Sequence, residues 1–73
     1  MVRNYRLIDL DCANCAAKME REIAKIKGVN NETVNFMTTK MTIDADDERI
    51  DEIEKEAEKI VKKLESEVTM KRI

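Results

Sequence analysis

The chain has 73 residues, which is enough for one small domain and too few for a catalytic cleft of ordinary size. Its residues are 42% hydrophobic and 41% charged, with one tyrosine and one phenylalanine, so we expect a thin aliphatic core under a highly charged surface. The net charge of −2, with no basic stripe and no aromatic series for stacking bases, argues against nucleic-acid binding. No apolar stretch is long enough to span a bilayer.

The first half of the chain predicts a strand and a helix. Residues 2–10 are expected to form a strand, because Tyr5 and Leu7 alternate with polar residues, and Leu10 is expected to be buried at the strand's end. A helix is expected from Asn14 to Lys27, with Asn14 as its cap and Gly28 as its stop. Its apolar residues recur every three or four positions, at Ala16, Met19, Ile23 and Ile26.

The second half predicts two strands, a helix and a last strand. Residues 29–36 are expected to form a strand, and Met41 and Ile43 mark the next one. A second helix is expected to start within residues 44–47, where acidic side chains would suit the positive end of its dipole. Its apolar stripe consists of Ile50, Ile53, Ala57, Ile60, Val61 and Leu64. Val68 and Met70 mark a short final strand.

This order of elements, strand-helix-strand-strand-helix-strand, favours an α+β fold. Each helix has one apolar stripe, and one sheet face can cover both stripes. We therefore predict a ferredoxin-like β-α-β-β-α-β sandwich, with a four-stranded antiparallel sheet and two helices on one face. It is expected to form a single domain over residues 1–73.

The two cysteines of the chain lie in the stretch Asp11-Cys12-Ala13-Asn14-Cys15, between the first strand and the first helix. Their spacing lets both sulfurs reach one ion, and the helix N-terminus favours the thiolates that metals require. Two thiolates alone suit copper(I). The Asp11 carboxylate adds a hard oxygen and a third negative charge, which favours a divalent zinc, cadmium or lead ion.

Other interpretations of the cysteine pair lead to different chemistry. A structural zinc site would need two further cysteine or histidine ligands, and the chain has none, so an incomplete, solvent-facing site for reversible loading is predicted. A C-x-x-C thiol-disulfide oxidoreductase is a less favoured alternative, because the chain is short for a thioredoxin-like fold. Burial of both cysteines in the core is disfavoured by the polar neighbours Asp11 and Asn14. The scattered methionines are expected to pack in the core rather than to ligate copper.

The residues Asp11-Cys12-Ala13-Asn14-Cys15-Ala16-Ala17-Lys18, with Gly28-Val29 further on, resemble the heavy-metal-associated domain. That family occurs at the N-terminus of metal-exporting P-type ATPases and as free metal chaperones. The resemblance implies that Cys12 and Cys15 are the paired thiolate ligands. An aspartate before the first cysteine, here Asp11, resembles the branch that exports zinc, cadmium and lead, whereas the copper branch usually has threonine there. The family often has Gly-Met before the motif, where this chain has Asp9-Leu10.

The resemblance implies a metal-binding module that is not itself an enzyme. We expect it to bind the ion for transfer to, or regulation of, a metal-exporting ATPase, with the membrane part or other cytosolic domains of that pump as its partners. A free-standing copper(I) chaperone on the same fold is the alternative. The expected location is cytoplasmic, with no membrane insertion of this segment. Glu65 and Glu67, before the last strand, are further candidate metal ligands, and a solvated turn is the competing interpretation.

Overall fold

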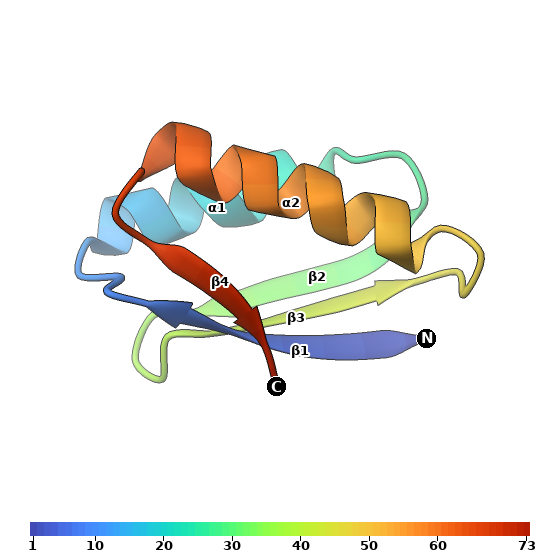
Figure 1. Ribbon diagram of the computed structural model, residues 1–73, viewed down its shortest axis with the longest axis horizontal. Helices are drawn as coiled ribbons and strands as arrows, with labels where there is room; N and C mark the ends of the chain where they lie inside the picture. The colour runs from blue at the N-terminus through green and yellow to red at the C-terminus, as the bar shows by residue number, and fades with distance from the viewer.

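The computed structural model describes residues 1–73 and contains four strands and two helices. In chain order they are β1 (Val2–Ile8), α1 (Ala13–Ala24), β2 (Val29–Asn35), β3 (Lys40–Ala45), α2 (Ile50–Leu64) and β4 (Thr69–Arg72). The strands form one antiparallel sheet in the order β2-β3-β1-β4, and both helices cover the same face of it (Figure 1). The predicted ferredoxin-like sandwich is confirmed.

The core lies between the sheet and the helices and consists of 15 buried residues, all of them hydrophobic. Alternation along the strands places Tyr5 and Leu7 of β1 and Met41 and Ile43 of β3 against the helices. Leu10 is also buried, as predicted, and ties the loop after β1 to this core. The loop that carries the cysteines therefore starts from a fixed point.

The first helix is shorter than predicted. It starts at Ala13 and ends at Ala24, and the chain then makes a tight turn in which the N–H groups of Lys25 and Ile26 donate to carbonyls three residues back. Gly28 completes the turn with a φ of +101°, a conformation that favours glycine. The prediction that Gly28 stops the helix is wrong, because α1 ends at Ala24 with Lys25 as its C-cap, and Gly28 instead ends the turn that leads into β2.

The predicted start of the second helix within residues 44–47 is wrong. Asp44 belongs to β3, where it pairs with Val2 of β1, and the last residue of this strand, Ala45, pairs with Val29 of β2. Pairing on both sides of β3 outweighs the preference of acidic residues for a helix start. The helix begins at Ile50 instead, and Asp51 and Glu52 are the acidic residues of its first turn.

The outer strand β2 carries an unusual buried carboxylate. Glu32 lies opposite Ile43 of the core, and neither of its buried carboxylate oxygens has a hydrogen-bond partner. Burial, together with the nearby charge of Glu20 on α1, raises the pKa of Glu32 to about 8. The Glu20 carboxylate itself accepts a hydrogen bond of 2.8 Å from the Val34 N–H.

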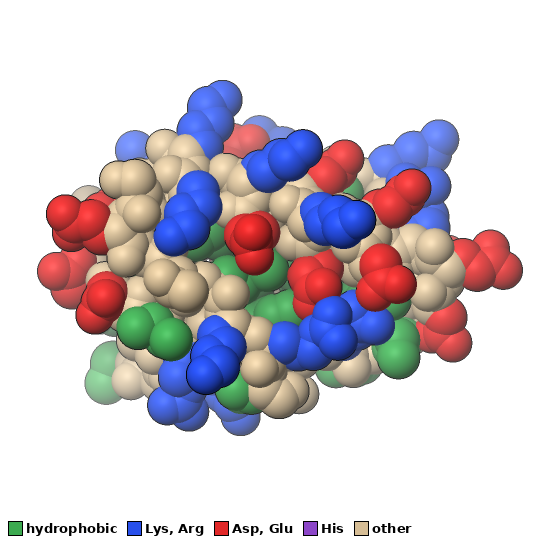
Figure 2. Space-filling view, in the orientation of Figure 1, with side chains coloured by type: hydrophobic (Ala, Val, Ile, Leu, Met, Phe, Trp, Pro, Cys, Tyr) green, Lys and Arg blue, Asp and Glu red, His purple; other side chains and the backbone are tan.

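Ion pairs join the sheet to α2 at the end of the molecule away from the cysteines. Arg72 of β4 donates two hydrogen bonds to Glu54, at 2.9 and 2.7 Å, and Arg3 of β1 donates one to Asp51 at 2.8 Å. Acidic and basic side chains are interspersed over the face shown in Figure 2. Neither helix is sufficiently long and apolar to cross a membrane.

The two chain ends are held by β1 and its neighbour β3. The N-terminal ammonium donates to the Ala45 carbonyl at 2.8 Å, and the Ile73 N–H donates to the Asn4 carbonyl at 3.0 Å. The C-terminal end of β1, where the cysteine loop begins, is occupied by neither terminus (Figure 1).

Candidate metal-binding site

The loop between β1 and α1 turns sharply before the first cysteine. Asp9 has a φ of +68°, in the left-handed region that aspartate and asparagine tolerate better than most residues. The next residue, Leu10, enters the core, and Asp11 is exposed. An aspartate in this conformation thus makes a turn that glycine would make with less strain.

Cys12 is the N-cap of α1. Its sulfur accepts a hydrogen bond of 3.3 Å from the Cys15 N–H, and its carbonyl accepts the first helical hydrogen bond, from Ala16, at 3.1 Å. The prediction that Asn14 caps the helix is wrong, because Asn14 already lies within the first turn. An N-cap side chain normally supplies an oxygen acceptor, and here a sulfur takes that role.

Cys15 lies in the first turn of α1 and points toward the loop before β4. Its sulfur is 3.2 Å from Oε2 of Glu65, the C-cap residue that directly follows α2. The contact joins residues 50 positions apart in the sequence. Both cysteines are free thiols and half-buried, so a small ion can reach them from solvent.

The two thiols differ in acidity. Hydrogen bonds from Cys15, through its thiol and its backbone N–H, lower the pKa of Cys12. The same contact with Cys12, followed by the one with Glu65, raises the pKa of Cys15 to about 12. Cys12 is therefore the first of the pair to become a thiolate, and Cys15 holds its proton between two acceptors.

The structure brings some of the predicted ligands together and leaves others apart. Cys12, Cys15 and Glu65 are linked by pairwise contacts. Asp11 and Glu67 are exposed and form no hydrogen bond or ion pair with another side chain. No three Cys, Asp or Glu side chains converge closely enough to surround an ion in this arrangement.

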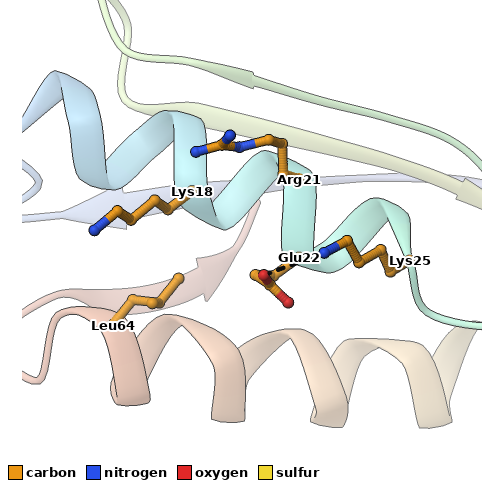
Figure 3. A pocket seen from close by; sticks show the side chains of 5 residues that line it. All are labelled: Lys18, Arg21, Glu22, Lys25 and Leu64. Carbon is orange, nitrogen blue, oxygen red and sulfur yellow. Dashed lines mark ion pairs between the residues drawn. The ribbon is translucent and has the colours of Figure 1, made fainter.

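A cavity of about 280 Å³ lies between the two helices. Lys18 and Glu22 line it from α1, Lys25 lines it from the position directly after α1, and Leu64 lines it from α2 (Figure 3). Glu22 and Lys25 pair at 3.5 Å. Arg21 adds another cation, so the rim of the cavity is positive overall. We did not predict it from the sequence, although the spacing of residues 18, 21 and 25 indicates one helix face.

Two comparisons show which known protein sequences this chain resembles. A model of the heavy-metal-associated domain matches residues 4–68. The chain is 38% identical over 69 residues to a cadmium, zinc and cobalt-transporting ATPase of Bacillus subtilis, covering 94% of this chain and 10% of the ATPase. It is also 38% identical over 45 residues to a zinc/cadmium/lead-transporting P-type ATPase of Escherichia coli, covering 62% of this chain and 6% of that protein. The chain thus spans about a tenth or less of the length of these relatives.

Solved structures agree in fold. The apo N-terminal domain of ZntA is 28% identical, with a TM-score of 0.73 over 99% of this chain and 90% of that domain. The N-terminal domain of a potential copper-translocating P-type ATPase of Bacillus subtilis, solved with Cu(I) bound, is 25% identical, with a TM-score of 0.75 over 97% of this chain and 84% of the other. Domains described as binding zinc and domains described as binding copper therefore share this architecture.

Proposed function

Because the chain belongs to the heavy-metal-associated domain family, a family of metal-binding domains, we propose that it binds a zinc, cadmium or lead ion through Asp11, Cys12 and Cys15. The observation that carries the proposal is the pair of free thiols at the start of α1, one of them capping the helix. The ion is the cargo of this domain. The domain either transfers it to a metal-exporting P-type ATPase or regulates that ATPase according to whether the ion is bound.

The charge of the ligand set favours a divalent ion. Two thiolates and one carboxylate carry three negative charges, so a divalent ion leaves one uncompensated and a monovalent ion leaves two. The exposed Asp11 side chain is free to turn toward the sulfurs, because it has no partner to give up. Glu65, already in contact with Cys15, is the second oxygen donor that we propose, whereas Glu67 is proposed only as a solvated charge.

Ligand exchange is the chemistry that this site suits. An ion held by two sulfurs and one or two oxygens from an exposed loop can accept a donor from an incoming protein before it leaves. The lowered pKa of Cys12 makes that thiol the first to lose its proton to a metal. Glu65 beside Cys15 is placed to accept the second proton.

The test is a competition titration of the reduced protein with zinc, cadmium, lead and copper(I), using Asp11→Asn and its matched control Asp9→Asn. Both variants remove one negative charge from the same loop, and asparagine also tolerates the left-handed φ of Asp9. Because even outer-shell partners of a metal typically contribute 10- to 100-fold in affinity, we expect Asp11→Asn to weaken binding of the divalent ions by about tenfold or more. Binding of copper(I) should change little.

The result that contradicts the proposal is an equal loss for copper(I) and the divalent ions, or an equal loss in the Asp9→Asn control. A second matched pair, Glu65→Gln and Glu67→Gln, examines the additional oxygen donor. We expect Glu65→Gln to weaken divalent binding and Glu67→Gln to leave it unchanged.

Copper(I) binding by the two thiols alone is the second candidate function. It is favoured by the absence of a third ligand in the present arrangement of side chains and by the likeness to a domain solved with Cu(I) bound. The same titration separates the two proposals, because a two-sulfur site would prefer copper(I) to the divalent ions, and Asp11→Asn would then leave the binding of the divalent ions unchanged as well.

A further inference from the structure

The face of the sheet away from the helices carries a row of cations on adjacent strands. Arg6 of β1 lies directly opposite Lys40 of β3 on one side and Lys71 of β4 on the other. All three side chains are exposed, and none forms an ion pair. Residues directly opposite on one sheet face have Cβ atoms about 5 Å apart, so like charges here destabilise the sheet.

The rest of this face does not neutralise the row. Asp44 is the one carboxylate at an outward position of the four strands, and it lies 3.6 Å from the N-terminal ammonium. The row continues to Asn35 of β2, which lies opposite Lys40, and apart from the exposed Ile8 of β1 its flanking positions carry neutral hydrogen-bonding side chains. These are Asn4, Thr33, Thr42 and Thr69.

Protection of the sheet edge does not account for these cations. Lysine often occurs on edge strands, where it discourages pairing with another chain. Lys71 lies on the edge strand β4, but Arg6 and Lys40 lie on the two central strands. The positive row also contrasts with the net charge of −2, because the other eleven basic and all sixteen acidic residues leave the rest of the chain with a net negative charge.

We propose that this row, Arg6, Lys40 and Lys71, is a docking surface for an acidic segment of a partner protein. Three cations in line, with amide and hydroxyl groups near them, match a chain of carboxylates in charge and in hydrogen bonding. An anionic membrane fits less well. Three cations supply only about 1 kcal/mol each near a lipid surface, which is little for holding a whole domain at a membrane.

The docking surface and the metal site lie on different parts of the domain. The row lies on the open face of the sheet, whereas the cysteines lie at the start of α1, which covers the other face. An acidic segment can therefore hold the domain without covering the thiols, and the two sites can be tested independently.

The experiment is an NMR titration of the ¹⁵N-labelled domain with a synthetic peptide of alternating glutamate and glycine, against the same peptide with glutamine for glutamate. We expect shifts at residues of β1, β3 and β4 with the acidic peptide alone. Replacing Arg6, Lys40 and Lys71 together by glutamine should weaken binding about tenfold, since exposed ion pairs each contribute modestly. Added salt should weaken binding to the unmodified domain.

A matched control removes the same charge from the helical layer. Lys55, Lys59 and Lys63 are exposed on α2 and unpaired, so their triple glutamine variant should bind the peptide nearly as the unmodified domain does. Equal weakening in the two triple variants, shifts confined to the helices, or no binding of the acidic peptide would each overturn the proposal. Binding to vesicles rich in anionic phospholipid without binding to the peptide would overturn it in favour of a membrane surface.

Discussion

Replacement of Glu32 by glutamine should stabilise the domain in neutral and alkaline solution and leave its stability unchanged in acid. Glu32 is buried at both carboxylate oxygens, has no hydrogen-bond partner and faces the charge of Glu20. Its pKa is about 8 in the folded chain, against an ordinary 4.5. Between these values the folded state binds the proton more strongly than the unfolded state, so stability falls as the pH rises.

The size of the effect follows from the two pKa values. Each tenfold change in proton affinity is worth about 1.4 kcal/mol, so a rise from 4.5 to about 8 gives a ceiling of about 5 kcal/mol. The side chain is only partly buried, and solvent screening reduces this ceiling, so we expect about 2 kcal/mol. The cost is absent below pH 4.5 and fully present above pH 8.

The assay is urea unfolding of the reduced, metal-free protein, followed by circular dichroism across this pH range. The difference in unfolding free energy between Glu32→Gln and the unmodified chain should grow with pH. Glu56→Gln, at an exposed position of α2, is the matched control and should show no such trend. A difference for Glu32→Gln that stays constant with pH would refute the reasoning, because the gain would then come from packing and not from ionisation.

Three further predictions concern other parts of the molecule. Gly28→Ala should destabilise the fold by about 2 kcal/mol in urea unfolding, because the left-handed φ costs an alanine about 1–2 kcal/mol and its Cβ would lie 2.7 Å from Nε of Arg49. Glu54→Gln should cost about 1 kcal/mol above pH 4.5 in the same assay, and nothing once the carboxyl is protonated, because paired arginines lower the pKa of Glu54. Glu65→Gln should lower the pKa of Cys15, measured as a faster reaction with a thiol reagent at pH 9, because it removes a neighbouring negative charge.

The sequence predicts the architecture well because both helices and the central strands have a one-sided apolar pattern. The alternation in β1 and the three-and-four spacing in α1 and α2 each indicate which face is buried, and one sheet face satisfies both helices. The errors fall at element boundaries. Asp44 begins an acidic stretch of the kind that often precedes a helix. It lies in β3 nevertheless, because it pairs with Val2 of β1, and this pairing between distant residues cannot be read from the local sequence.

The sequence allowed us to predict which residues belong to the candidate site, but not all of the contacts between them. The spacing of Cys12 and Cys15 predicts a paired thiol site at a helix start, and that placement is found. The approach of Glu65 to Cys15 depends on how α2 crosses α1, so the sequence indicated it only through the family resemblance. The role of Asp11 remains a prediction, because its side chain is exposed and has no partner in the structure that would indicate one.

The anchoring of both chain ends along β1 has a practical consequence. Residue 1 is fixed beside Ala45 and residue 73 beside Asn4, whereas the thiols lie past the opposite end of the same strand. A tag, a fluorophore or a surface attached at either end therefore leaves the thiols open to ions and to incoming donor groups. In a longer polypeptide, the flanking segments would likewise depart on the side away from the thiols, which would face outward toward any exchange partner.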